Sequence, residues 1–222
     1  MKVLALIAAY RGKGMIGSTV EAVRSVADVD EVVVVDDGSS DGTAEEAAAA
    51  GARVMIAPSN LGKGGALEGA LGRIPAADVV LLLDQDLGGS AKEATALLEP
   101  VLAGAADVAI GVLPRQAGHG GFRLVKRMSA ALIRRLSGFR AEEPMSGQRA
   151  LTWEALAAVR PLAGGFGVEL GMTVDAVRGG FRVAEVPVAM SHAPTGRNVS
   201  GFVHRARQGR DHLRAALHRM SR

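Results

Sequence analysis

Short apolar runs alternate with segments of helical periodicity along most of the chain. The apolar runs are as long as strands and lack polar alternation, as is typical of strands buried on both faces of a sheet. Strands are predicted over residues 2–9, 31–35, 53–56, 78–83, 107–112, 147–151 and 182–188. Helices are predicted over residues 17–26, 43–51, 64–73, 91–102, 122–136, 153–159, 168–178 and 202–220. This rhythm predicts an α/β fold with a mostly parallel central sheet and helices on both faces.

Helix boundaries are also marked by local polar residues. Thr43 and Glu46 have the spacing of a capping box, which predicts that the helix over 43–51 begins with reciprocal hydrogen bonds between these two residues. Gly51 then ends that helix. No internal repeat and no long linker divides the chain, so we expect residues 1–222 to form a single domain.

The composition fits one globular α/β domain. Of the 222 residues, 48% are apolar and 22% are charged. No apolar run approaches the roughly 18 residues of a membrane span, and the apolar start of the chain is interpreted as a first core strand rather than a signal peptide. The absence of cysteine excludes disulfides, thiolate zinc sites and cysteine nucleophiles. These features favour a cytoplasmic protein.

The formal net charge is only +3, but the basic residues are concentrated near the C-terminus. We therefore predict a basic C-terminal helix over 201–222. Such a helix could pack on the sheet or on a second subunit as a homodimer, or it could contact anionic lipid at the inner face of the membrane. We expect no nucleic-acid partner.

Two predicted strands end in acidic clusters. Asp36 and Asp37 follow the strand over 31–35, and the strand over 78–83 leads into Asp84-Gln85-Asp86. Ligands of open α/β sheets bind beyond the carboxyl ends of the strands, so the two clusters are predicted to share one site. Asp84 and Asp86 would point to the same side of a continuing strand and could share a hard divalent cation. The alternative is a pair of surface acids that cap a turn.

The residues around these clusters allow both chemical and local roles. Asp36 could accept hydrogen bonds from a base or a ribose, whereas Asp37 and its neighbours suit a turn. Lys63 stands in Asn-Leu-Gly-Lys-Gly at a predicted helix start, where backbone N–H groups attract anions, although a plain turn fits equally well.

Two further titratable residues are candidates. Glu169, among small and apolar neighbours, could act as a general base with a pKa raised by desolvation, or it could pair with an arginine such as Arg149. His192 follows the last predicted strand and could complete a metal shell or contact phosphate, or do neither.

The ordered motifs resemble family 2 glycosyltransferases of the GT-A fold. They are Asp-Asp-Gly-Ser-Ser-Asp-Gly-Thr from residue 36, Asn-Leu-Gly-Lys-Gly from residue 60, Asp-x-Asp from residue 84, Ser-Gly-Gln-Arg-Ala from residue 146 and Gly-Phe-Gly-Val-Glu-Leu from residue 165. The pattern is most similar to polyprenyl- and dolichyl-phosphate sugar transferases and to glucosyl-3-phosphoglycerate synthases. Such enzymes usually have Asn-Glu after the tyrosine of the first strand, where this chain has the basic segment Arg11-Gly12-Lys13.

The resemblance implies a site and a reaction. A nucleoside diphosphate sugar would bind to the half formed by residues 1–112, and the acceptor to residues 113–200. A UDP-sugar is favoured, and a GDP-sugar stays an alternative. The expected reaction transfers a hexosyl group to a polyprenyl phosphate or a small phosphorylated molecule. The implied residues are Ala9, Tyr10, Asp36 and Lys63 for the nucleotide, Asp84, Asp86 and His192 for Mg²⁺ or Mn²⁺, and Glu169, Arg149 and Arg197 for the acceptor and phosphate.

Two other functions stay open. A sugar-phosphate nucleotidyltransferase would also use an α/β sheet with a glycine-rich loop after the first strand, which Arg11-Gly12-Lys13-Gly14 faintly matches. A non-catalytic nucleotide-sugar-binding module would use the same fold without turnover. The intact Asp84, Asp86 and Glu169 favour an enzyme over the binding module.

Overall fold

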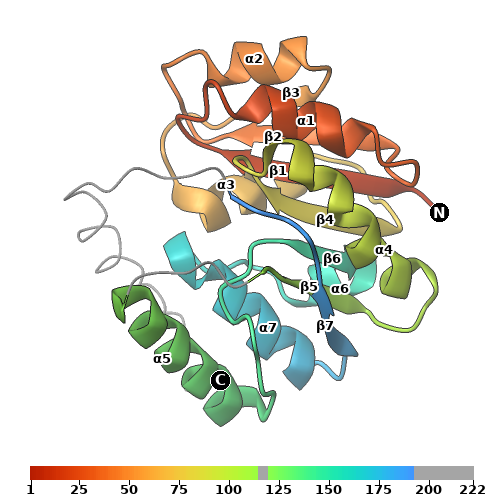
Figure 1. Ribbon diagram of the computed structural model, residues 1–222, viewed down its shortest axis with the longest axis vertical. Helices are drawn as coiled ribbons and strands as arrows, with labels where there is room; N and C mark the ends of the chain where they lie inside the picture. The colour runs from red at the N-terminus through yellow and green to blue at the C-terminus, as the bar shows by residue number, and fades with distance from the viewer. Residues whose placement is uncertain (115–119, 193–222) are drawn as a thin grey trace.

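The computed structural model describes residues 1–114 and 120–192 and folds them around one central sheet (Figure 1). The predicted basic helix over 201–222 and the candidate phosphate ligand Arg197 lie outside the described residues.

The sheet has seven strands in the order β3-β2-β1-β4-β6-β5-β7. All neighbouring strands run parallel except β6, which is antiparallel to both β4 and β5. The strands are β1 (Val3–Ala9), β2 (Glu31–Asp36), β3 (Arg53–Ile56), β4 (Val79–Asp84), β5 (Val108–Val112), β6 (Arg149–Thr152) and β7 (Val183–Pro187). The predicted mostly parallel sheet is therefore confirmed.

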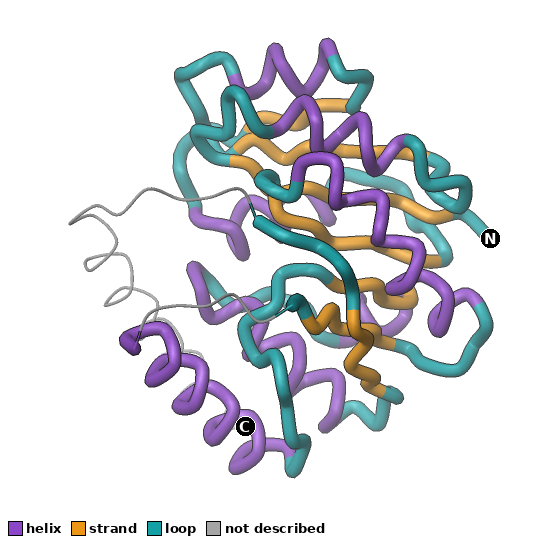
Figure 2. Tube along the Cα trace, viewed as in Figure 1, coloured by secondary structure: helices purple, strands orange, loops and turns teal. Residues whose placement is uncertain are grey.

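Helices cover both faces of the sheet, as Figure 2 shows. One face is covered by α1 (Ile16–Arg24), α2 (Thr43–Ala49), the 3₁₀ helix η1 (Gly88–Ala94) and α4 (Thr95–Leu102). The other face is covered by α3 (Gly62–Leu71), α6 (Trp153–Ala158) and α7 (Val168–Arg178), which the short 3₁₀ turn η2 (Gly165–Gly167) precedes. Outside this layer, α5 (Gly120–Ser137) packs on α7 through a small cluster around Ile133.

Burial on both faces explains the continuous apolar runs of the sequence. Leu6 and Ile7 are neighbours on β1, and neither has exposed surface, because Leu6 packs into one helical layer and Ile7 into the other. Within the described residues, no helix is both long and apolar enough to cross a bilayer.

The predicted capping box at Thr43 and Glu46 is wrong. Gly42, with φ of 93°, is the N-cap of α2, and no side chain caps the helix there. The Glu46 carboxylate instead accepts hydrogen bonds from the backbone N–H groups of Gly14, at 2.6 Å, and Gly17, at 2.9 Å. Backbone donors in the loop after β1 and in the first turn of α1 therefore replace the local partner, and they hold this segment against α2.

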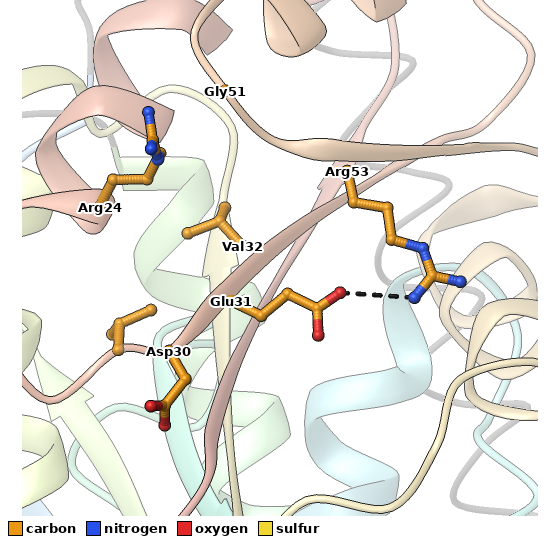
Figure 3. Close-up of a pocket in the computed structure, with 7 residues that line it drawn as sticks. Arg24, Asp30, Glu31, Val32, Gly51 and Arg53 are labelled. Atoms are coloured by element: carbon orange, nitrogen blue, oxygen red, sulfur yellow. Dashed lines mark hydrogen bonds and ion pairs between the residues drawn. The ribbon is translucent and has the colours of Figure 1, made fainter.

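The described structure has a cavity of about 310 Å³ at the amino ends of β2 and β3 (Figure 3). Glu31 and Arg53 form an ion pair of 3.4 Å on its wall. The acidic clusters lie at the opposite, carboxyl ends of the strands, so this cavity does not belong to the predicted site.

Candidate functional site

The sheet register brings the two acidic clusters to either side of β1. Asp36, the last residue of β2, is paired with Ala9, and Asp84, the last residue of β4, is paired with Ala8. The two carboxylates thus lie at the ends of β2 and β4, the strands on either side of β1 in the sheet. This arrangement agrees with the predicted single site beyond the carboxyl ends of the strands.

Asp84 is held on both carboxylate oxygens. Lys63 Nζ lies 2.6 Å from Oδ1, and the Gln148 side-chain amide donates to Oδ2 at 2.7 Å. Burial by itself raises the pKa of Asp84, but the ammonium of Lys63, with help from His192 and Gln148, outweighs burial and holds the pKa below its usual value. Asp84 is therefore an anion in the folded protein at neutral pH.

Lys63 joins two carboxylates from different elements. Its ammonium also lies 2.9 Å from Glu169 Oε1, so the first turn of α3 is linked both to the end of β4 and to the first turn of α7. Burial opposes the charge of Lys63, but Asp84 and Glu169 raise its pKa well above the usual value. Lys63, rather than Arg149, is the cation that pairs directly with Glu169.

Asp86 and His192 form a second pair. His192 Nδ1 lies 2.9 Å from Asp86 Oδ1, and this hydrogen bond, partly offset by burial, raises the pKa of the imidazole. The segment before His192 is fixed because the Ser191 N–H donates to the Ser90 hydroxyl at 3.0 Å. Since β4 ends at Asp84, the strand alternation expected to align Asp84 with Asp86 does not extend to Asp86.

The donor set has the right chemistry for a hard divalent cation, although its members are engaged with one another and with Lys63. Two carboxylates and an imidazole, from Asp84, Asp86 and His192, are ligand types that Mg²⁺ and Mn²⁺ sites use. Among the described residues, no three His, Cys, Asp or Glu side chains are gathered closely enough to hold a metal ion. Metal binding by these three residues stays a prediction.

The two acids of the first cluster have different partners, and the binding of a nucleotide by Asp36 stays a prediction. Asp36 is 1% exposed, and its Oδ1 accepts the N–H of Ser39 at 3.0 Å. Asp37 accepts the backbone N–H groups of Leu61, at 2.7 Å, and Gly62, at 2.8 Å. Asp37 therefore fixes the start of α3, and with it the position of Lys63. This role is structural, as expected, but its partners are remote in sequence and do not belong to the turn that contains Asp37.

Tyr10 is the exposed residue at the end of β1. Its side chain is 39% exposed, and the Arg11 guanidinium lies 5.3 Å from the ring centroid. The Gln85 side chain binds the backbone of Tyr10 twice, accepting from its N–H at 2.8 Å and donating to its carbonyl at 3.2 Å. Ala9 is buried in the core, so Tyr10 is the one of the two that presents side-chain surface.

Arg149 does not lie on an open surface as expected for an acceptor contact. It is completely buried: β6 is an interior strand that pairs with both β4 and β5, and the side chain of its first residue reaches Thr173 on α7. Nε donates to the Ser146 carbonyl at 2.9 Å and Nη1 to the Thr173 hydroxyl at 3.0 Å, whereas Nη2 has no partner among the described residues. Burial lowers the pKa of Arg149 to about 10, opposed by nearby carboxylates including Glu169. The Arg149 guanidinium is therefore buried beneath the site residues and presents no surface to an acceptor.

Two residues of the Ser-Gly-Gln-Arg-Ala motif contact the charged groups of the site, although the motif did not predict these contacts. The side-chain amide of Gln148 donates to Asp84. Gly147 lies against the charged groups: a Cβ on it would be 2.4 Å from Lys63 Nζ and 2.6 Å from the Asp84 carboxylate oxygens. Only a glycine admits this approach of the loop before β6.

The comparison with protein families adds a decisive observation, because residues 5–153 match the model of glycosyl transferase family 2. The chain belongs to this family. One relative is glycosyltransferase AglJ of Haloferax volcanii, 33% identical over 173 residues, which cover 76% of this chain and 56% of that protein. Another is glucosyl-3-phosphoglycerate synthase of Mycolicibacterium paratuberculosis, 33% identical over 186 residues, or 72% of this chain and 55% of that protein. The chain thus spans little more than half the length of these relatives.

Solved structures support the same assignment. The chain is similar to the crystal structure of glucosyl-3-phosphoglycerate synthase from Mycobacterium tuberculosis in complex with Mn²⁺, UDP and phosphoglyceric acid, with a TM-score of 0.81 and 27% sequence identity. That match covers 98% of this chain and 78% of the other. The predicted GT-A fold is confirmed by this likeness.

Proposed function

We propose that this family 2 glycosyltransferase moves a hexosyl group from a nucleoside diphosphate sugar to a small phosphorylated acceptor, with Mg²⁺ or Mn²⁺ as cofactor. The main structural support for this proposal is the pair of carboxylates, Asp36 and Asp84, on the two strands that flank β1, with Lys63 bound to Asp84. A site of this form offers polar acceptors for a nucleoside at one strand and a cation-binding acid at the next.

The donor is proposed to be a UDP-sugar. Tyr10 offers an exposed ring, and Asp36, which is buried and bonded to Ser39, ends the neighbouring strand beside Ala9. An aromatic ring and a carboxylate are groups that suit a base and a ribose. Similarity to a synthase crystallised with Mn²⁺, UDP-glucose and phosphoglyceric acid supports UDP over GDP.

Asp84, Asp86 and His192 would hold the divalent cation. When bound, such a cation neutralises negative charge on the departing diphosphate. Lys63 remains protonated beside this position, because Asp84 and Glu169 raise its pKa, and it therefore adds a fixed positive charge toward which a diphosphate is drawn.

Glu169 is proposed to face the acceptor. It sits in the first turn of α7 at 7% exposure, joined to the donor side through Lys63. An acceptor hydroxyl needs a base to take its proton, and Glu169 is the carboxylate that the geometry offers for this role. An acceptor phosphate is already anionic and would need only cationic positioning.

The direct test is transfer from UDP-glucose to 3-phosphoglycerate in the presence of Mn²⁺, followed by UDP release and by mass spectrometry of the product. We expect turnover that EDTA abolishes, loss of at least a hundredfold in Asp86→Ala, and wild-type turnover in the matched surface variant Asp28→Ala. Wild-type rates in Asp86→Ala would contradict the proposal. Pyrophosphate release from UTP and glucose 1-phosphate would favour the nucleotidyltransferase instead.

A polyprenyl phosphate is the second acceptor to be tested. This alternative depends on the predicted basic helix over 201–222, which could contact anionic lipid or form a homodimer. Transfer to a short-chain polyprenyl phosphate, flotation with anionic liposomes and sedimentation of the free protein separate these possibilities. Activity with 3-phosphoglycerate but no flotation would exclude the lipid role.

A further inference from the structure

The segment that connects α6 to α7 runs along α3 in the opposite direction. Leu162 is bonded to Glu68 in the second half of α3, and Ala163 lies against Gly64, one turn nearer the start of that helix. The segment then enters α7, whose first turn carries the carboxylate that pairs with Lys63 at 2.9 Å. The path of the segment along α3 therefore determines where this carboxylate meets the ammonium.

Glu68 holds the segment through both of its carboxylate oxygens. Oε1 accepts from Nε of Arg160 at 3.0 Å and from Nη2 at 2.7 Å, and Oε2 accepts the backbone N–H of Leu162 at 3.0 Å. Burial by itself raises the pKa of Glu68, but the hydrogen bonds from Arg160 and Leu162 outweigh burial and hold the pKa below its usual value. Glu68 is therefore charged at neutral pH, and its contacts are charge-assisted hydrogen bonds.

The contact at Gly64 and the contact at Glu68 act in opposite directions. A Cβ on Gly64 would lie 2.0 Å from the carbonyl oxygen of Ala163, so the segment is already as close to α3 as a glycine allows. Steric contact prevents a closer approach, and the Glu68 carboxylate opposes separation. Together they fix the spacing between α3 and the segment before α7.

We propose that Glu68 is a positioning residue for the acceptor side of the site, because it holds the segment before α7 against α3 and so sets the contact between Lys63 and Glu169. The inference rests on the proposed function, in which Glu169 faces the acceptor. Displacing a reacting group by about 1 Å can cost on the order of 100-fold in rate, so a residue that acts only through its neighbours can still affect turnover.

The test compares Glu68→Ala with Asp107→Ala. The Asp107 carboxylate also binds one arginine and one backbone N–H: it accepts from Arg182 N–H at 2.7 Å, from Nε at 3.0 Å and from Nη2 at 2.7 Å. Asp107 precedes β5 at the amino end of the strand, whereas the site lies at the carboxyl ends. Its replacement therefore controls for the loss of an equivalent clamp away from the site, and urea unfolding compares the stabilities of the two variants.

The first measurement is the reactivity of the Lys63 amine without any substrate. Each protein is treated with acetic anhydride, and mass spectrometry follows acetylation of Lys63 relative to that of the exposed Lys13. Asp84 and Glu169 raise the pKa of Lys63, so loosening of the contact with Glu169 should increase its reactivity. We expect a rise of about threefold or more in Glu68→Ala and little change in Asp107→Ala.

The second measurement separates the acceptor from the donor in the transfer assay. With UDP-glucose and Mn²⁺ saturating, kcat/KM for 3-phosphoglycerate should fall about tenfold in Glu68→Ala, while the KM for UDP-glucose stays within about threefold of wild type. Asp107→Ala should change neither value by more than about threefold. Glu68→Gln keeps the acceptor oxygen but not the charge, so its effects should have the same direction and be smaller. It also carries the test if Glu68→Ala does not fold.

The outcomes are distinct for the inference and for the proposed function. Unchanged acetylation of Lys63 in the folded Glu68 variants, or an equal change in Asp107→Ala, would overturn the positioning role and leave the proposed function standing. Raised acetylation with an unchanged kcat/KM for the acceptor would overturn the link to the acceptor. If wild type transfers no sugar, the proposed function fails and takes that link with it, while acetylation still decides whether Glu68 sets the contact between Lys63 and Glu169.

Discussion

At the scale of single residues, the shared ion pair of Lys63 makes a prediction about metal binding. Its ammonium lies 2.6 Å from Oδ1 of Asp84, a carboxylate that we propose as one of the residues that would hold the cation. Replacing Lys63 with methionine removes this competitor, so the affinity for Mn²⁺ without nucleotide should rise on the order of tenfold, whereas affinity for the UDP-sugar should fall. Calorimetric titration with Mn²⁺ and then with UDP-glucose measures both.

The matched control is Lys13→Met. Lys13 is an exposed lysine in the loop after β1, where its ammonium approaches Gly42 rather than Asp84. The Lys13→Met substitution removes one positive charge, as Lys63→Met does, and leaves the ion pairs of Lys63 with Asp84 and Glu169 intact. A rise in Mn²⁺ affinity of equal size in both variants would show that net charge, not exchange at Asp84, governs binding.

The Asp86–His192 pair predicts a pH dependence. The hydrogen bond from Asp86 raises the pKa of His192 above its ordinary value of 6.5, so the protonated form persists to higher pH than in a free imidazole. This pair stabilises the metal-free fold below that ordinary value, and the contribution is lost as the pH rises through the raised pKa. Metal binding needs the neutral ring, so Mn²⁺ affinity should increase over the same rise in pH.

Mn²⁺ titrations between about pH 6 and 8.5, compared with His192→Asn, check this expectation. Asparagine has no proton to lose, so the variant should bind Mn²⁺ more weakly and with a flatter pH profile. An unchanged slope in His192→Asn would assign the pH dependence to another group.

The residue types of the site could be predicted from the sequence, but their pairing could not. Asp84, Lys63 and Glu169 were each recognisable because acids after a strand and a lysine at a helix start suit the chemistry. The Lys63 ammonium contacts both Asp84 and Glu169 because α3 and α7 converge. No local sequence pattern predicts this convergence. The complete burial of Arg149 likewise depends on the pairing of β6 with two strands.

At the scale of elements, the convergence of α3 and α7 depends on Gly64. A Cβ on this residue would lie 2.0 Å from the carbonyl oxygen of Ala163, in the segment that leads into α7. Gly64→Ala should therefore push the two elements apart, lower the free energy of unfolding by about 1–3 kcal/mol and loosen the contact between Lys63 and Glu169. Urea unfolding measures the loss of stability.

Gly69→Ala in the same helix is the control. Gly69 is exposed, and its added Cβ would meet nothing within 4 Å. Alanine has the higher helix propensity, so this variant should be more stable than wild type by up to about 1 kcal/mol. Equal effects of the two substitutions would show that helix propensity, not the approach of Ala163, dominates at Gly64.

Elements were more predictable than the contacts between them. The predicted helices and strands within the described residues are present near their expected bounds, because buried runs and helical periodicity are local signals. The helix predicted over 91–102 is the exception, since its first part belongs to the 3₁₀ helix η1 and α4 begins at Thr95. Local signals did not predict that β6 runs antiparallel to its neighbours. They also predicted a capping box at Thr43 that the structure does not have. The Glu46 carboxylate accepts from Gly14, in the loop after β1, and from Gly17, in the first turn of α1, and both are remote in sequence.

At the scale of the whole molecule, the sheet order places the carboxylate proposed for the nucleoside and the carboxylate proposed for the metal on opposite sides of β1. Asp36 ends β2 and Asp84 ends β4, so a nucleoside diphosphate that bridges them would contact both strands and the cation at once. A ligand that binds only the folded chain raises the melting temperature by mass action. Metal and nucleotide should therefore stabilise the protein more together than separately.

A thermal unfolding series measures this coupling. Mn²⁺ alone and UDP-glucose alone should each raise the melting temperature slightly, and the two together should raise it by more than the sum, because each ligand increases the affinity for the other. Asp86→Ala should keep a response to UDP-glucose and lose the extra increment, whereas Asp28→Ala should behave as wild type. GDP-glucose with Mn²⁺ should give a smaller increment than UDP-glucose if Tyr10 and Asp36 select the base. Purely additive shifts in wild type would place the metal and the nucleotide at separate sites and would contradict a single site across β1.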